Sequence, residues 1–162
     1  MQAGRSSLSD PKSAFARLRY RRRYAATRAK MAVFDEHDAI FVHVPKTGGV
    51  AVSSALFGQD TIGGHRPARI YRLIYGAKCY EEMFTFGFVR DPIDRLISAY
   101  SYLKAGGRHH SSDRESAEAL AGVGSLDDFV REQLGVGALA SMAHFRPQSD
   151  LVSTVASRSA ST

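Results

Sequence analysis

The hydrophobic pattern of the first half of the chain predicts a buried strand, a tight turn and a helix, in that order. Residues 39–44 form a nearly continuous apolar run with β-branched and aromatic side chains, which is typical of a parallel strand buried on both faces. After the turn at 45–49, small and apolar residues resume over 50–57 and stop at Gly58. A helix that ends at a glycine has this pattern.

A second unit of the same order begins at residue 84. Residues 84–89 alternate aromatic and small side chains like a strand, and Asp91 and Pro92 follow as the N-cap and first residue of a helix. The apolar side chains of this helix share one stripe at helical spacing: Ile93, Leu96, Ile97, Tyr100 and Leu103. We therefore expect this stripe to face the core.

The segments around these two units have weaker patterns. Residues 69–78 predict a short helix with its apolar side at Ile70, Leu73 and Ile74. Residues 105–124 are rich in glycine, serine and charge, so we expect an exposed excursion. A capping-box pattern at 125–128 then predicts a further helix, whose buried face would hold Leu126, Phe129, Val130 and Leu134.

Strands that alternate with helices predict an α/β fold, three-layered and P-loop-like, with a central parallel sheet flanked by helices. In such folds ligands bind beyond the carboxyl ends of the strands, where both turns would lie. We expect three parts: a basic arm at 1–31, a domain at 32–151 and a disordered, Ser-rich tail at 152–162.

Composition narrows the class of protein only slightly. The 162 residues are 44% hydrophobic, which suits one modest core. The net charge of +6 favours acidic partners without choosing among nucleotides, sulfated sugars, nucleic acid and anionic lipid. Cys79 is the only cysteine, so an intramolecular disulfide is excluded and a reducing compartment is expected. Neither a membrane span nor a signal peptide is visible, which predicts a cytoplasmic protein.

Basic side chains are densest in residues 1–31: Arg17, Arg19, Arg21, Arg22, Arg23, Arg28 and Lys30. They alternate with aromatic residues, so one interpretation is a basic helix on a membrane surface or a phosphate backbone. The alternative is a solvated arm that packs a few aromatic rings on the domain. We keep peripheral membrane contact as an expectation and do not expect nucleic acid as the partner.

The first turn, Lys46-Thr47-Gly48-Gly49, has the composition of an anion cradle. A strand that delivers a lysine and two glycines to a helix N-terminus offers a cation and several free backbone N–H groups. It differs from a Walker A loop, in which the lysine follows the glycines. The alternative interpretation is an ordinary strand-to-helix turn with a surface lysine.

The second turn offers a partner for a second anion. Arg90 precedes the capped helix, and Ser98 lies on that helix away from the apolar stripe. A guanidinium and a hydroxyl together suit a phosphate. Alternatively, Arg90 forms an ion pair with Asp91 or Asp94 and Ser98 faces solvent.

Two segments resemble a known family. Residues 41–49 (FVHVPKTGG) are similar to the 5′-phosphosulfate loop of sulfotransferases that use 3′-phosphoadenosine-5′-phosphosulfate (PAPS), and residues 88–100 (FVRDPIDRLISAY) resemble their 3′-phosphate motif. The nearest branch modifies carbohydrates of the heparan and chondroitin type and has bacterial relatives. The resemblance extends over 39–151 and implies PAPS as the donor and no metal.

The resemblance also implies roles for the residues of both turns. Lys46 would contact the transferring group and the bridging oxygen, and Thr47, Gly48 and Gly49 would supply backbone donors. Arg90 and Ser98 would hold the 3′-phosphate. Where the family commonly has a hydroxyl residue this chain has Val50, for which Ser53 or Ser54 would have to substitute.

Histidine is the expected general base, because its pKa suits proton removal near neutral pH. His65 follows a glycine pair in a segment that resembles the position of the family's base. The alternatives are a surface role for His65, a packed core role for His43 and solvent exposure of His109 and His110. His144, in the segment 144–148 (HFRPQ), resembles a later family segment near the site.

The remaining expectations concern the acceptor, the C-terminal end of the domain and the rival functions. Arg66 and Arg69, followed by Arg72, either bind an acidic sugar acceptor or form a solvated face. The tail does not resemble the continuation of the family domain, so we expect an incomplete, C-terminally truncated form. The rival functions are a P-loop small-molecule kinase and a nonenzymatic anion-binding or nucleotide-binding module. The oligomeric state is left open.

Overall fold

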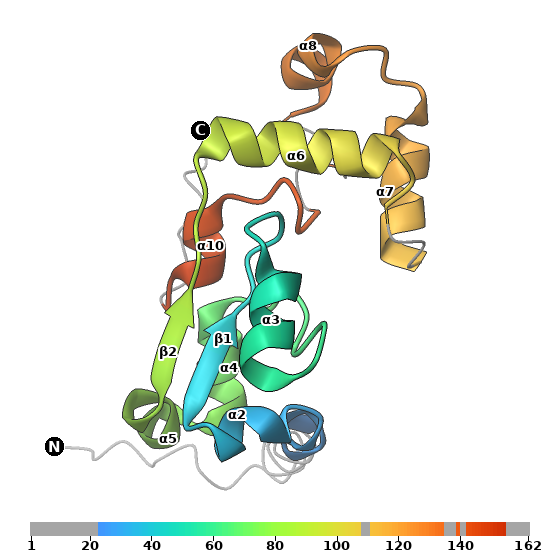
Figure 1. Ribbon diagram of the computed structural model, residues 1–162. Coiled ribbons are helices and arrows are strands. Elements are labelled where there is room, and N and C mark those ends of the chain that lie inside the picture. Colours follow the sequence, from blue (N-terminus) through green and yellow to red (C-terminus); the bar gives the residue numbers. More distant parts are fainter. Residues whose placement is uncertain (1–22, 108–110, 135–138, 140–141, 155–162) are drawn as a thin grey trace, which may run out of the picture.

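The computed structural model describes residues 23–107, 111–134, 139 and 142–154 (Figure 1). The expectations for most of the basic arm, for His109 and His110 and for the end of the tail concern residues outside these ranges. Residues 23–29 of the arm are helical.

A parallel two-stranded sheet lies at the centre of the first half of the chain. Strand β1 (Ala39–Val42) pairs with β2 (Phe84–Gly87) in a register that places Ala39 beside Phe84 and Val42 beside Gly87. Both strands therefore end at the same edge. The mixed α/β class with a parallel sheet is confirmed, and two strands form the sheet within the described residues. A wider three-layer, P-loop-like sheet stays a prediction.

Helices pack beside this sheet and extend beyond its carboxyl edge. In Figure 1, α6 crosses above the ends of both strands, and α7 runs from the far end of α6 at a steep angle to it. The helices are α2 (Ala32–Glu36), α3 (Gly49–Phe57), α4 (Ala68–Tyr75), α5 (Ala77–Glu82), α6 (Pro92–Lys104), α7 (Ser111–Ala121), α8 (Leu126–Asp128), the π-helical turn η1 (Phe129–Gln133) and α10 (Gln148–Val152). Among the described helices, none has the length and apolar character needed to cross a bilayer.

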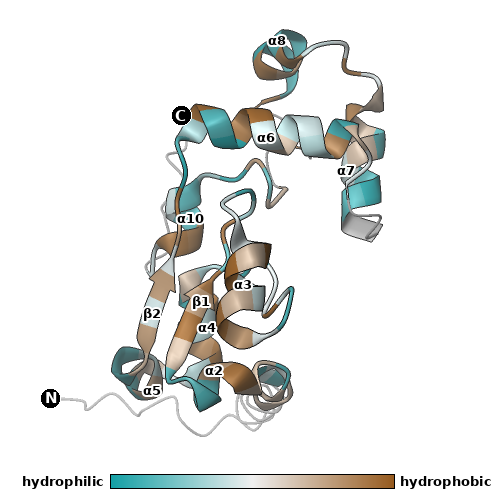
Figure 2. Cartoon of the chain, in the orientation of Figure 1, coloured by the Kyte–Doolittle hydropathy of each residue, from teal (hydrophilic) through white to brown (hydrophobic). Residues whose placement is uncertain are grey.

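The buried apolar residues form two clusters. The first lies between β1 and the helices α2, α3 and α4, where Phe34, Phe41 and Tyr71 are fully buried. The second lies between α6, α7 and η1, around Leu103 and Phe129. Hydrophobic residues are correspondingly concentrated around β1, α3 and α4 in Figure 2, whereas hydrophobic and hydrophilic residues alternate along α6. The cavity described below lies between the two clusters.

Helix α6 begins as expected but turns a different face to the core. The Asp91 carboxylate accepts hydrogen bonds from the backbone N–H groups of Ile93 (2.9 Å) and Asp94 (3.1 Å), which confirms the N-cap. The predicted buried stripe is wrong at its start, because Ile93 is 68% exposed and Ile97 is 42% exposed. The buried face is instead Arg95, Ala99 and Leu103, because α7 and the segment 142–146 cover that side.

Two other expectations about exposure need correction. Residues 105–124 are not an exposed excursion, since they contain α7, whose Asp113, Ser116 and Leu120 are buried. In α4 the buried ring is Tyr71, while Leu73 is 49% exposed. Tertiary contacts decided which faces of α4 and α7 are buried.

The capping box is confirmed, but the helix that follows it differs from the expectation. The Ser125 side chain accepts from the N–H group of Asp128, and the Asp128 carboxylate accepts from Ser125. The segment then changes to a π-helical turn, and Val130, expected to be buried, is 41% exposed. Phe129 is fully buried, as predicted.

Candidate functional site

A cavity of about 730 Å³ opens at the carboxyl end of β1. Its lining comes from the turn after β1 with the start of α3, the 61–65 loop, Tyr102 with the start of α7, and the segment 142–144. The cavity therefore lies where parallel α/β folds bind ligands, as the sequence predicted.

The turn after β1 is shaped by two left-handed residues. Lys46 (φ +66°) and Gly48 (φ +82°) both have positive φ, and the Thr47 hydroxyl donates to the Val44 carbonyl at 2.9 Å. Gly48 is the N-cap of α3, whose first N–H groups have no partners within the helix. A Cβ added at Gly48 would meet no atom within 4 Å. A cation and helix N–H groups thus border open space, which suits an anionic ligand.

Gly49 is fixed by a different constraint, a close approach to His43. A Cβ at Gly49 would lie 2.0 Å from both Cδ2 and Nε2 of the His43 ring. His43 is only 4% exposed and stacks on Phe41 at a centroid distance of 5.5 Å. Its predicted burial is confirmed, but the ring also lines the cavity. Burial, reinforced by His65 and His144, lowers the pKa of His43 to about 4, so the imidazole is neutral at pH 7.

The structure places His65 in the same cavity as Lys46. Its Nδ1 lies 3.2 Å from the His43 carbonyl oxygen. Because a carbonyl only accepts, Nδ1 carries the proton and Nε2 of the neutral ring is the proton acceptor. Burial lowers the pKa of His65, an effect that the hydrogen bond to His43 partly opposes. His65 is therefore a partly buried, neutral imidazole with a defined tautomer, as a general base requires.

His144 also lines the cavity, from the segment that was expected to lie near the site. Its ring centroid is 5.8 Å from that of His65 and 5.6 Å from that of Tyr102. Burial, with the neighbouring His65 as a second cause, lowers the pKa of His144 to about 4. Three neutral histidines, His43, His65 and His144, thus meet beside Lys46.

Arg95 holds the His144 segment against α6, a role that the sequence did not reveal. Its guanidinium donates to the carbonyls of His144 (2.9 Å) and Arg146 (2.6 Å), and the side chain is buried. Burial lowers the pKa of Arg95, although a guanidinium stays charged. Arg95 lies off the predicted apolar stripe, so the hydrophobic pattern gave no sign of its burial. The sequence feature that could have drawn attention to Arg95 is its place within the 88–100 motif.

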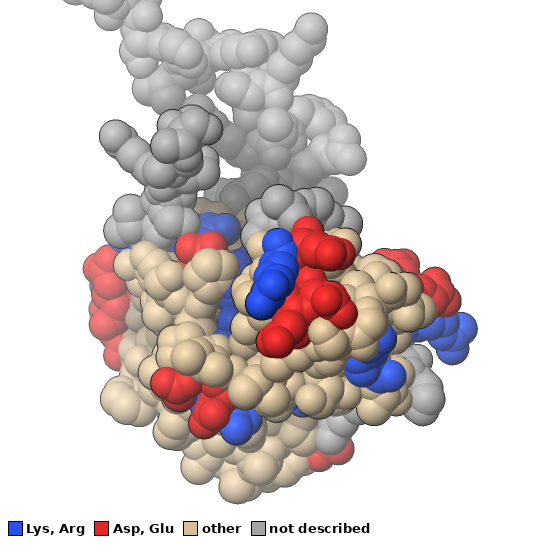
Figure 3. Space-filling view, turned by 90° about the horizontal axis from the view of Figure 1, so that it is seen from above, with Lys and Arg blue, Asp and Glu red and all other residues tan. Residues whose placement is uncertain are grey.

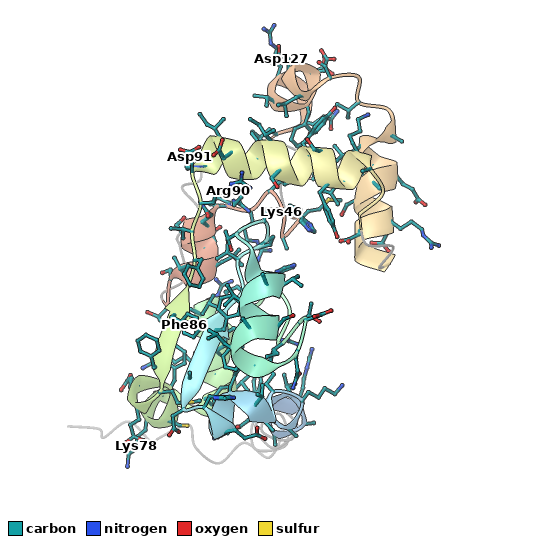
Figure 4. All side chains as sticks on the ribbon, in the orientation of Figure 1. Lys46, Lys78, Phe86, Arg90, Asp91 and Asp127 are labelled. Atoms are coloured by element: carbon teal, nitrogen blue, oxygen red, sulfur yellow. The ribbon has the colours of Figure 1, made fainter. Side chains whose placement is uncertain are left out.

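Arg90, which follows β2, and Ser98, which lies on α6, do not line the cavity. Figure 4 shows Lys46 and Arg90 in the layer between the strand ends and α6. The Gln148 side chain forms two hydrogen bonds with the Arg90 backbone: it accepts from the N–H group at 3.0 Å and donates to the carbonyl at 2.8 Å. The Arg90 side chain is 44% exposed and its guanidinium lies 4.0 Å from Asp94, the ion pair of the alternative interpretation. Ser98 is half-buried.

Among the remaining predicted residues, Val50 lines the cavity, whereas Thr47, Arg66 and Arg69 do not. Arg69 donates to the carbonyl of Asp150 at 3.2 Å. Val50 contributes an apolar side chain to the lining, while Ser54 bonds to Asp60 at 2.6 Å instead. Ser53, the other candidate substitute, is fully buried, and neither serine lines the cavity.

The start of α7 forms the wall that sequence analysis missed. Asp113, Glu115 and Ser116 line the cavity, but the composition of 105–124 predicted exposure and gave no signal for them. In the described residues no group of three or more histidine, cysteine or carboxylate side chains could hold a metal ion. On the face seen from above, basic and acidic side chains are mixed rather than segregated (Figure 3).

Comparison with known proteins gives the family. A model described as "Sulfotransferase family" matches residues 69–155, just over half of the chain. The chain belongs to this sulfotransferase family. It is accordingly a transferase, with sulfuryl transfer as the reaction that its family indicates. The match includes Arg90, Ser98 and the 144–148 segment, whereas the turn at 45–49 and His65 precede it. No curated protein and no solved structure matches the chain.

Proposed function

We propose that this protein transfers the sulfuryl group of PAPS to a hydroxyl group of a carbohydrate or another small acceptor. One observation carries the proposal: a single cavity at the end of β1 brings the Lys46 ammonium together with the neutral imidazole of His65. A cation for the sulfuryl oxygens and a base for the acceptor hydroxyl are the two groups that this reaction requires.

The described residues fit both ends of the donor. The open space beside Gly48, the α3 N-terminus and Lys46 suit the phosphosulfate end. Arg90 and Ser98, which follow the neighbouring strand, suit the 3′-phosphate. Since β1 and β2 are adjacent and parallel, the two groups lie on the same edge of the sheet.

The chain's own residues supply the proton and charge steps. His65 Nε2 takes the proton of the acceptor hydroxyl as that oxygen forms its bond to sulfur. The sulfur–oxygen bond to the donor phosphate breaks, and Lys46 stabilises the negative charge on the departing oxygen. PAPS, when bound, supplies the activated sulfuryl group. The transfer changes no oxidation state, so its atoms and electrons balance without an oxidant.

The cavity volume of about 730 Å³ falls within the range of small-molecule sites. This volume supports an acceptor of the size of a sugar residue beside the sulfuryl end of the donor. A carbohydrate of the heparan or chondroitin type is the acceptor class that the sequence resemblance favours. Arg66 and Arg69 would bind its acidic groups only beyond the cavity, since neither lines it.

Calorimetry with adenosine 3′,5′-bisphosphate tests the donor site. We expect wild type to bind with roughly −8 kcal/mol, a micromolar dissociation constant, and Lys46→Ala and Arg90→Ala each to weaken binding about tenfold or more. Matched controls are Lys78→Ala, whose side chain is 91% exposed, and Arg72→Ala, which removes a surface ion pair with Glu81. Equal affinity in all five proteins would refute the donor site.

A transfer assay with radiolabelled PAPS and a panel of sugar acceptors tests the base. His65→Ala should lower kcat about a hundredfold or more while bisphosphate affinity stays near that of wild type. His37→Ala is the control, because His37 is exposed and packs on Phe57 rather than in the cavity. Unchanged turnover in the His65 variant would remove this residue from the mechanism.

A further inference from the structure

The ammonium group of Lys46 lies on the face of an aromatic ring from helix α6. Its Nζ is 3.8 Å from the centroid of the Tyr102 ring, well within the distance of a cation–π interaction. Both side chains line the cavity. Tyr102 is near the C-terminal end of the helix whose N-terminal end carries the Arg90 turn, so one helix borders both parts of the proposed donor site.

The Tyr102 ring is itself held in place from α7. Its hydroxyl donates to the Asp113 carboxylate at 2.6 Å, and Asp113 is 6% exposed. Gly107 packs closely against this side chain, because a Cβ at Gly107 would lie 2.7 Å from the Asp113 Cβ. Asp113 therefore fixes the rotation of the ring on which Lys46 lies.

We infer that Tyr102 is a positioning residue for Lys46, with Asp113 fixing its ring, an inference that rests on the proposed sulfuryl transfer. The face of an aromatic ring attracts an ammonium group without adding a negative charge. The interaction therefore directs Lys46 into the cavity without neutralising its positive charge. A positioned lysine acts on the charge that develops during transfer, so the effect falls on turnover more than on donor affinity.

Three variants separate the ring from its hydroxyl. Tyr102→Leu removes the π face, Tyr102→Phe keeps it, and Phe84→Leu is the matched control, since Phe84 is 70% exposed on β2. We expect kcat to fall about 3- to 30-fold in Tyr102→Leu. The KM for PAPS should change less than about threefold. Tyr102→Phe keeps the ring but loses the hydrogen bond to Asp113 that fixes its rotation, so its kcat should fall less than that of Tyr102→Leu.

A measurement without donor tests the contact itself. In protein with isotope-labelled lysine, the Lys46 ε-methylene protons should be shifted upfield by the ring current of Tyr102, and Lys46→Arg assigns the signal. The upfield shift should persist in Tyr102→Phe and disappear in Tyr102→Leu, with circular dichroism confirming that both variants are folded.

The outcomes distinguish this inference from the proposed function. If wild type neither binds the bisphosphate nor transfers sulfate, the proposed function fails, and the positioning role fails with it even where the ring-current shift is present. If wild type is active but Tyr102→Leu has the same kcat, or Lys46 shows no upfield shift, the inference alone is overturned. An equal loss of kcat in Tyr102→Leu and Tyr102→Phe would also overturn it.

Discussion

Replacement of Gly49 by alanine tests the packing beneath the site. The new Cβ would lie 2.0 Å from two atoms of the His43 ring, about half of an ordinary contact distance. The ring is packed on several sides, because it is 4% exposed, stacks on Phe41 and meets the edge of His65 at a centroid distance of 4.6 Å. Overpacking of this kind lowers the free energy of unfolding by about 1–3 kcal/mol. The higher helix propensity of alanine raises it by up to about 1 kcal/mol.

We therefore expect Gly49→Ala to lower the free energy of unfolding by about 1–2 kcal/mol. Turnover should fall about tenfold or more, because His65 takes its orientation from the His43 carbonyl. Urea denaturation followed by circular dichroism, and the transfer assay, measure the two effects. Gly122→Ala is the control, since a Cβ there meets nothing within 4 Å, and its stability should stay within about 1 kcal/mol of wild type.

A second substitution shows whether the clash with His43 is the cause. In a double-mutant cycle, His43→Ala should remove the penalty of Gly49→Ala, with a coupling free energy of about 1–2 kcal/mol. Stability and turnover of Gly49→Ala equal to those of wild type would refute the packing described for Gly49 and His43.

Three further predictions concern other parts of the fold. Because burial holds the pKa values of His43 and His144 at about 4, below the ordinary 6.5, the unfolded chain binds more protons between these values. Stability present above pH 6.5 is therefore lost as pH falls, by on the order of 2 kcal/mol per histidine at pH 5, and equal urea midpoints at pH 7 and pH 5 would contradict this. Arg95→Met leaves the carbonyls of His144 and Arg146 without their donor and should cost about 3 kcal/mol in urea denaturation; a loss below about 1 kcal/mol would show that the guanidinium does not hold this segment. Ser125→Ala removes the capping box and should lower the thermal unfolding free energy by about 1 kcal/mol, whereas an unchanged melting temperature would show that the cap contributes nothing.

Local sequence determined the elements that carry the candidate site. The apolar run of β1, the N-cap Asp91 and the Gly58 helix end each depend on residues close in the chain, and the structure has all three. The order of strand, turn and helix also placed Lys46 and Arg90 at one sheet edge, because parallel neighbouring strands end on the same side.

Tertiary packing decided which faces are buried and which residues meet. Periodicity identifies an apolar stripe but not the element that covers it, so Ile93 is exposed while Arg95 is buried under the His144 segment. Composition predicted solvent exposure for α7, yet the turn at Gly107 folds it back so that Asp113 reaches Tyr102. Sequence by itself predicted the turn at 45–49 as a candidate anion cradle. Contacts between residues far apart in the chain decided which histidine, tyrosine ring and carboxylate lie around its lysine, because side-chain packing depends on three-dimensional shape rather than on local order.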